Sequence, residues 1–94
     1  LIGSVLGFAA VRPHGTGEAE LEGLFVEPAH WRQGIGRALM ARAVAWALER
    51  GDRRLVVIAN LAAVPFYEAE GFVAEGPYET RFGPALRMAK RLEA

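Results

Sequence analysis

The sequence predicts a mixed α/β (α+β) fold, and three consecutive segments lead to that prediction. Residues 19–26 begin with alternating polar and apolar side chains, which is typical of a half-buried strand. Residues 34–50 repeat apolar side chains every three or four positions, as a helix with an apolar face does. Residues 55–59 (Leu-Val-Val-Ile-Ala) are continuously apolar, which is typical of a parallel strand buried on both faces. Together they predict a right-handed βαβ unit within a mixed sheet.

The segments before this unit predict further strands on one side of it. Residues 5–11 read as a strand, with residues 3–4 as the turn before it and residues 1–2 as the stub of an earlier strand. Residues 13–17 (Pro-His-Gly-Thr-Gly) are a loop between two strands. Gly23, inside the following strand, predicts a β-bulge or a close backbone approach.

The segments after the unit complete the predicted sheet. Residues 61–70 read as a short helix, because Pro65 is tolerated only in a first turn and Gly71 ends the pattern. Residues 72–80 and 85–91 read as two more strands. Since no repeat or linker interrupts the chain, we expect a single domain over residues 1–94.

The composition argues against several classes of protein. The 94 residues carry 11 Lys and Arg against 11 Asp and Glu, and zero net charge argues against a nucleic-acid or anionic-lipid binder. The absence of cysteine excludes disulfides, thiolate metal sites and cysteine nucleophiles. The apolar runs are too short for a membrane span, and no signal peptide is visible, so we expect a cytoplasmic protein. The preference for Arg over Lys suggests a bacterial source.

The most informative segment is residues 26–39 (Val-Glu-Pro-Ala-His-Trp-Arg-Gln-Gly-Ile-Gly-Arg-Ala-Leu). A buried strand ends here, and Gly34 and Gly36 open a helix after a short loop. A helix N-terminus has free N–H groups and a partial positive charge, and glycines let a phosphate approach them. With Arg32 and Arg37 beside it, the segment predicts a phosphate or pyrophosphate cradle.

Two common phosphate-binding motifs do not fit this segment. A dinucleotide fingerprint needs a further glycine where Leu39 stands, and an acidic residue where Asn60 closes the next strand. A nucleoside-triphosphate loop needs Gly-Lys-Ser/Thr, which the segment lacks. The plainer alternative is a glycine-rich turn that only packs a helix close to a sheet.

Two motifs, in this order, give the chain a family resemblance. It resembles the GNAT superfamily of acyl-CoA-dependent N-acetyltransferases, whose signature Gln/Arg-x-x-Gly-x-Gly/Ala follows a strand ending Val-x-Pro. Residues 26–28 and 34–39 correspond to these parts. Residues 60–72 (Asn-Leu-Ala-Ala-Val-Pro-Phe-Tyr-Glu-Ala-Glu-Gly-Phe) are similar to the family's Asn-x-x-Ala-x-x-Phe-Tyr-x-x-x-Gly-Phe. The resemblance runs from about Val5 to the C-terminus. The chain departs from the family pattern at Trp31, which occupies the Gln/Arg position.

The resemblance implies a mostly antiparallel sheet whose central parallel pair splays apart to hold acetyl-CoA as co-substrate, with no metal. Strand residues expected to pair with its pantetheine arm are Leu24, Phe25 and Val26. Residues expected at its pyrophosphate are Arg32, Gln33, Gly34, Ile35, Gly36, Arg37 and Ala38. Asn60 would bind the pantetheine arm, and Tyr67 would lie at the thioester as general acid. The family's first strand and first two helices have no counterpart here, so we expect either that residues upstream of Leu1 are missing from this sequence or that the domain is short at its N-terminus.

The implied reaction moves an acetyl group to a small-molecule or peptide amine by direct attack in a ternary complex. A lysine-like amine has a pKa near 10.4, so attack at neutral pH needs a base. Glu22 is our candidate and Glu20 its neighbour, because both lie on the strand beside the expected cofactor gap. The plainer alternatives are that Glu20 and Glu22 are solvated strand carboxylates and that Tyr67 is a packed core aromatic residue.

Other features of the sequence bear on the acceptor, on metal binding and on the oligomeric state. Residues 55–59 carry no acid, which disfavours the family members that acetylate protein N-termini with a carboxylate on that strand. His14 and His30 have no second ligand at metal-binding spacing. A sheet edge near residues 5–11 favours a homodimer.

Two other functions compete with catalysis. The first is a non-catalytic acyl-CoA-binding module or half of a larger assembly. The second is a structural domain with an empty anion cradle.

Overall fold

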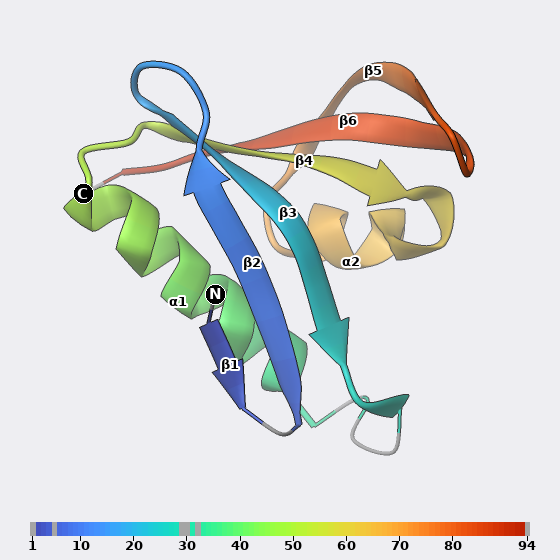
Figure 1. Cartoon of the computed structure of the whole chain (residues 1–94), viewed down its shortest axis with the longest axis horizontal. Helices are drawn as coiled ribbons and strands as arrows, with labels where there is room; N and C mark the ends of the chain where they lie inside the picture. Colours follow the sequence, from blue (N-terminus) through green and yellow to red (C-terminus); the bar gives the residue numbers. More distant parts are fainter. Residues whose placement is uncertain (1, 5, 29–30, 32, 94) are drawn as a thin grey trace.

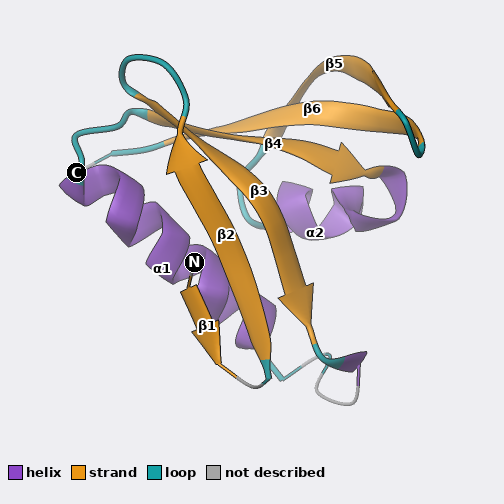
Figure 2. Ribbon diagram, in the orientation of Figure 1, coloured by secondary structure: helices purple, strands orange, loops and turns teal. Residues whose placement is uncertain are grey.

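In a computed structural model, the described part of the chain forms a six-stranded sheet with two α-helices (Figures 1 and 2). The structure describes residues 2–4, 6–28, 31 and 33–93. In chain order, the elements are β1 (Ile2–Ser4), β2 (Gly7–Pro13), β3 (Glu18–Val26), α1 (Ile35–Glu49), β4 (Arg54–Asn60), the 3-10 helix η2 (Leu61–Ala63), α2 (Val64–Ala69), β5 (Val73–Thr80) and β6 (Gly83–Arg91).

The strand order confirms the predicted mixed sheet. The strands lie in the order β1-β2-β3-β4-β6-β5, and every neighbouring pair is antiparallel except β3 and β4. Helix α1 connects these two parallel strands, as predicted for a βαβ unit. The fold is therefore a mostly antiparallel sheet with one parallel pair at its centre.

The parallel pair is joined only at its beginning. β3 and β4 pair from Glu18 opposite Arg54 to Leu21 opposite Val57, and then the two strands diverge. Residues 23–26 of β3 continue paired with β2, and residues 58–60 of β4 continue paired with β6. The ends of the two strands therefore splay apart, as the diverging arrows of β3 and β4 show in Figure 1, and we call the region between them the gap.

A β-bulge marks the point where the gap opens. Ala10 lies opposite Gly23 and Val11 lies opposite Leu21, so Glu22 is the extra residue of β3. This irregularity is the one that Gly23 predicted. Because a bulge bends a strand and increases its twist, it gives a local reason for β3 to leave β4 here.

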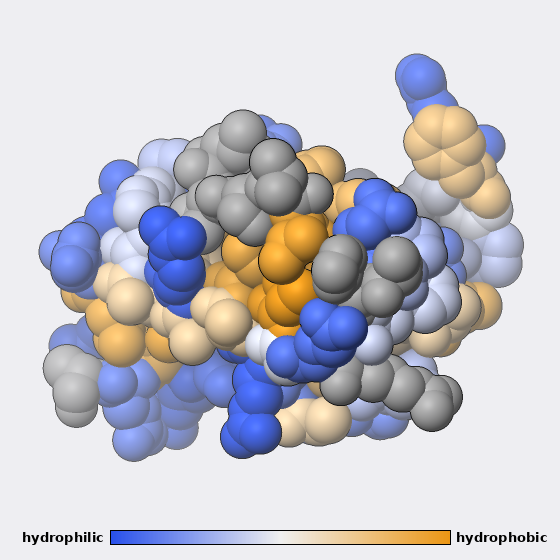
Figure 3. All heavy atoms as spheres, turned by 90° about the horizontal axis from the view of Figure 1, so that it is seen from below, coloured by the Kyte–Doolittle hydropathy of each residue, from blue (hydrophilic) through white to orange (hydrophobic). Residues whose placement is uncertain are grey.

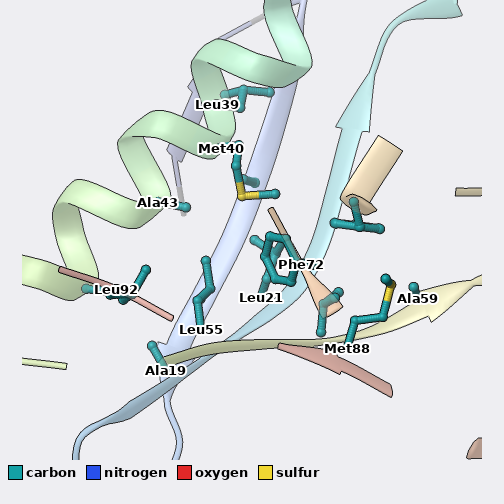
Figure 4. Close-up of a cluster of buried hydrophobic side chains, with 14 residues drawn as sticks. Ala19, Leu21, Leu39, Met40, Ala43, Leu55, Ala59, Phe72, Met88 and Leu92 are labelled. Atoms are coloured by element: carbon teal, nitrogen blue, oxygen red, sulfur yellow. The ribbon is translucent and has the colours of Figure 1, made fainter. Parts of the chain in front are cut away.

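Both helices cover the same face of the sheet. Alternate residues of β4 (Leu55, Val57 and Ala59) join a single buried cluster, and so do α1 and α2. Figure 4 shows the side chains of this cluster between α1 and the strands. Its members are Ala9, Ala19, Leu21, Leu39, Met40, Ala43, Ala47, Leu55, Val57, Ala59, Tyr67, Phe72, Met88 and Leu92. We call the opposite face of the sheet, which carries Arg12 and Glu20, the outer face.

The N-terminal segment differs from the prediction in two ways. Gly3 and Ser4 are not a turn but part of β1, where they pair with Phe8 and Gly7. The strand predicted for residues 5–11 begins at Gly7, while Val5 lies outside the described residues. β2 is paired on both sides, so the sheet edge expected there belongs to β1 instead. Pairing with β2 overrides the weak turn preference of glycine and serine.

The second predicted helix is divided in two. Residues 61–63 form a 3-10 turn, and α2 begins at Val64 with Pro65 in its first turn. Because proline lacks an N–H donor, it fits at the start of an α-helix and not inside one. The 3-10 turn therefore gives way to the α-helix just before Pro65.

Candidate functional site

The N-terminus of α1 has the features of an anion-binding helix end. Gly34 is the N-cap, with a left-handed φ of 79°, and no side chain of the described residues caps the helix. The first helical hydrogen bond runs from the Ala38 N–H to the Gly34 carbonyl at 3.0 Å. Among the described residues, no hydrogen bond is seen from the N–H groups of Ile35, Gly36 and Arg37, and the first turn has no acidic residue. These donors and the helix dipole can bind a phosphate.

Close packing does not explain the two glycines. A Cβ atom on Gly34 would meet no atom within 4 Å, so its backbone angle and not its size requires glycine. A Cβ atom on Gly36 would lie 3.4 Å from the Phe66 ring and 3.6 Å from Val26, which are ordinary contacts. The alternative of a turn that only brings a helix close to a sheet is therefore not supported at these positions.

Gly36 lies where three elements of the candidate site meet. Its neighbours Phe66 and Val26 come from α2 and from the end of β3. Seen from below, the side toward which β3 points in Figure 1, an apolar strip crosses the middle of the surface between polar side chains (Figure 3). The half-buried side chains of Leu24, Val26 and Ile35 pack against the buried core. The helix end and the end of β3 are thus part of one region.

The other predicted cradle residues lie around this helix end. Ala38 and Arg37 are exposed in its first turn, and Gln33 is exposed just before the N-cap. Arg32 lies outside the described residues. Trp31 donates its indole N–H to the Val26 carbonyl at 2.9 Å, so this side chain already binds one backbone group of the expected pantetheine strand.

At the end of β3, one edge is paired with no other strand among the described residues. Leu24, Phe25 and Val26 pair with β2 on one side, while β4 has diverged on the other. An extended ligand can add to such an edge through backbone hydrogen bonds. The Phe25 ring lies on the Phe8 ring with centroids 5.7 Å apart, which further ties β3 to β2.

Asn60 stands at the end of β4, on the other side of the gap. Its Oδ1 accepts a hydrogen bond from the Ala62 N–H at 2.9 Å, so the side chain caps the 3-10 turn that follows. The two N–H donors of its amide have no partner among the described residues. Asn60 therefore has a structural role that the sequence did not predict, and it retains donors for a ligand.

Tyr67 is buried in the core on the helical face. Its side chain is 6% exposed and packs edge-on against Phe66 and Phe72, with centroids 5.3 and 5.4 Å away. Burial raises the pKa of its hydroxyl above the ordinary value of 10.0. The hydroxyl thus stays protonated at neutral pH, which a proton or hydrogen-bond donor requires. Tyr67 is therefore both a packed core aromatic residue and a side chain with a protonated hydroxyl at neutral pH.

Glu22 and Glu20 both lie beside the start of the gap, on the outer face. Arg12 donates to the Glu20 carboxylate at 2.9 Å and lies 3.4 Å from that of Glu22. Glu20 is also 3.3 Å from His14, and its side chain is much less exposed than that of Glu22. Glu22 is therefore the more accessible of the two carboxylates, while Tyr67 belongs to the opposite face.

Sequence reasoning missed two residues that shape this region. A Cβ atom on Gly7 would lie 2.5 Å from the Phe25 carbonyl oxygen, so β2 can approach β3 this closely only with glycine there. A glycine inside a strand pattern was the available signal. Arg12 was missed because its ion pairs depend on the register between β2 and β3, which no local pattern reveals.

Two other kinds of site have no support in the described ranges. No group of three or more His, Asp or Glu residues there could hold a metal ion. Within those ranges, too, none of the helices has both the length and the apolar character needed to cross a bilayer.

Comparison with known structures gives this geometry a context. Nourseothricin acetyltransferase matches 94% of this chain at 29% identity with a TM-score of 0.85, over 58% of its own length. The ribosomal-protein-S18-alanine N-acetyltransferase from Escherichia coli matches 95% at 31% identity with a TM-score of 0.77, over 63% of its length. An aminoglycoside 6'-N-acetyltransferase complexed with coenzyme A matches 95% at 20% identity with a TM-score of 0.84, over 67% of its length, and shows a shared fold.

The chain spans about two thirds of these proteins or less. No curated protein sequence matches it closely enough to count as a relative. The family model described as acetyltransferase (GNAT) matches residues 1–72. Because that match covers most of the sequence, the chain belongs to the acetyltransferase (GNAT) family.

Proposed function

We propose that this chain is an N-acetyltransferase that moves an acetyl group from acetyl-CoA to a primary amine of a small molecule or peptide. The observation that carries the proposal is the gap between β3 and β4, which lies in one region with the glycine-opened end of α1. An extended thioester arm with a pyrophosphate at one end has the matching shape and charge. Acetyl-CoA supplies the activated acetyl group as co-substrate.

The cradle residues bind the two parts of acetyl-CoA differently. The N–H groups of Ile35, Gly36 and Arg37, with the positive end of the helix, hold the pyrophosphate. The unpaired edge of Leu24, Phe25 and Val26 holds the pantetheine arm, and one of its N–H groups stabilises the oxyanion. The Asn60 amide donates to the arm from the opposite side. The Val26 carbonyl already accepts a hydrogen bond from the Trp31 indole, so it can bind the arm only by accepting a second bond or after the indole moves away.

Two residues move protons in the proposed reaction. The amine nitrogen attacks the thioester carbonyl carbon, its surplus proton passes to Glu22 directly or through water, and the C–N bond forms as the C–S bond breaks. Tyr67 hydrogen-bonds the leaving thiolate. Its pKa is raised by burial while an ordinary thiol has a pKa near 8.5, so Tyr67 stabilises the sulfur more than it fully protonates it. The two groups belong to opposite faces of the sheet, with the gap between them.

A thiol-release assay with acetyl-CoA and a panel of primary amines tests this function. We expect amine-dependent release, reduced on the order of a hundredfold in Glu22→Gln and much less in Glu20→Gln, the matched control on the same strand. Binding of acetyl-CoA without release for any amine would support the non-catalytic binding module instead. Equal losses in both variants would show that Glu22 is not the base.

A further inference from the structure

A small hollow lies at the end of β4, beside Asn60. Its volume is about 350 Å³, and the residues that line it are Ile58, Asn60, Leu61, Thr80, Phe82, Pro84 and Ala85. The hollow therefore joins three elements: the end of β4, the 3-10 turn, and the tip of the β5–β6 hairpin, which lies close to the end of β4 in Figure 1. Five of the seven lining residues are aliphatic or aromatic, and Asn60 and Thr80 contribute polar atoms.

The hollow and Glu22 are on the same face of the sheet. The alternate residues Leu55, Val57 and Ala59 point to the helices, so Ile58 and Asn60 point to the outer face. Arg12 reaches both Glu20 and Glu22, which places the Glu22 carboxylate on the outer face too. The hollow and the candidate base thus lie on the two sides of the gap, and an amine attacking from this face would lie between them.

The hairpin tip holds an aromatic ring out into solvent. Phe82 is 91% exposed. The turn that presents it is ordered by Thr80, whose hydroxyl donates to the Gly83 carbonyl at 2.8 Å and accepts from the Phe82 N–H at 3.1 Å. The Arg81 guanidinium lies 6.0 Å from the ring centroid, and the ring joins no apolar cluster of the described chain. An exposed phenyl ring at the rim of this mostly uncharged hollow provides surface that a ligand can bury.

We propose that this hollow binds an apolar or aromatic group of the acceptor, a few bonds from its amine, and that Phe82 closes over that group. The inference rests on the proposed function and adds the class of acceptor: an amine with a hydrocarbon substituent, not a polyamine or a polyhydroxylated amine. Few charges line the hollow, since its polar members are the neutral Asn60 and Thr80. A cationic substituent there would lose hydration without a carboxylate partner.

Two amines with the same aminoethyl group test the inference on the full chain. We expect kcat/KM for 2-phenylethylamine to exceed that for ethanolamine by at least tenfold, the order that burial of part of a phenyl ring supplies. Phe82→Ala lowers kcat/KM for 2-phenylethylamine about fivefold or more, and leaves ethanolamine and the KM of acetyl-CoA unchanged within twofold. Thr80→Val, which retains Phe82 but removes the hydroxyl that orders its turn, acts in the same direction. Val73→Ala removes exposed apolar surface elsewhere on β5 and changes neither ratio.

Nuclear magnetic resonance separates failure of the inference from failure of the proposed function. With acetyl-CoA or CoA present, 2-phenylethylamine shifts the amide signals of Thr80, Phe82 and Ala85, whereas ethanolamine does not. Shifts of these signals without thiol release would support the binding site but contradict the proposed acetyltransferase activity. No preference between the two amines, an equal loss for both in Phe82→Ala, or shifts confined to other residues would overturn the inference, whatever the rate of transfer.

Discussion

A Cβ atom on Gly7 would lie 2.5 Å from the carbonyl oxygen of Phe25, closer than any real Cβ contact. Gly7 pairs with Val26, so β2 fixes the end of β3 through a contact that no other residue can make. The opposite edge of that same segment lines the gap in which we place the pantetheine arm. Backbone packing on one side of β3 therefore sets the position of the candidate binding edge on the other.

Gly7→Ala is expected to weaken both the fold and acetyl-CoA binding. The added methyl must displace the Phe25 carbonyl or the β2 backbone, at a cost of about 1–3 kcal/mol in the free energy of unfolding. Urea denaturation measures this loss, and calorimetric titration measures the affinity for acetyl-CoA. Gly23→Ala is the control for stability, because a Cβ there would meet no atom within 4 Å. Equal unfolding free energies for the two variants would contradict the close approach.

The two glycines of the helix end are expected to respond oppositely to alanine. Gly34→Ala forces a left-handed φ of 79° on a residue with a Cβ, and should destabilise the protein by about 1 kcal/mol. Gly36→Ala adds helix propensity and makes only ordinary contacts, so it should stabilise by about 0.5–1 kcal/mol. The family signature accepts Gly or Ala there, so acetyl-CoA binding should persist. A strong loss of stability in Gly36→Ala would revive the packing explanation for this segment.

Asn60 is expected to separate capping from ligand binding. Asn60→Ala removes the acceptor for the Ala62 N–H and should cost about 1 kcal/mol of stability. Asn60→Asp retains a capping oxygen but loses the amide donors, so stability should stay near that of the wild type while the KM for acetyl-CoA rises. Thermal unfolding and steady-state kinetics on the two variants decide the matter. If Asn60→Asp binds acetyl-CoA as the wild type does, Asn60 is a cap and nothing more.

Tyr67 is expected to act as a protonated donor over the whole neutral range. Burial raises its pKa above 10.0, so the folded protein holds this proton more tightly than the unfolded chain does. The resulting stability is present below pH 10 and is lost as pH rises through the folded pKa. Tyr67→Phe should lower kcat about a hundredfold and abolish that alkaline loss of stability, with little change in stability at pH 7. If Tyr67→Phe has the same kcat as the wild type at every pH from 6 to 9, Tyr67 is a core aromatic residue and not a catalytic donor.

The central unit of the fold was predictable because its signals are local. The apolar run from Leu55 to Ala59 and the spacing of Ile35, Leu39 and Ala43 each indicate their element without reference to the rest of the chain. Gly23 likewise indicated the bulge at which β3 leaves β4. The N-terminal hairpin was mispredicted because Gly3 and Ser4 have turn propensities that pairing with β2 overrides.

The candidate site was predictable in its backbone parts and less so in its side chains. Two glycines at a strand-to-helix junction indicate an anion cradle by their spacing, and the structure retains its free donors. The bonds of Asn60, Trp31 and Arg12 depend on which segments meet in space, and no local pattern reveals this. For the same reason, the hollow beside Phe82 could not be foreseen, since residues 58 and 82 meet only through the pairing of β4 with β6.

The most direct test of the account is an amide NMR titration of the full chain with acetyl-CoA. We predict saturable shifts at Ile35, Gly36 and Arg37 from the pyrophosphate, and at Leu24 and Phe25 from the pantetheine arm. Desulfo-CoA, which retains the pyrophosphate and most of the arm, should reproduce the first set and most of the second. If acetyl-CoA leaves the Ile35, Gly36 and Arg37 signals in place, or shifts only residues remote from the gap between β3 and β4, the proposed binding site is wrong.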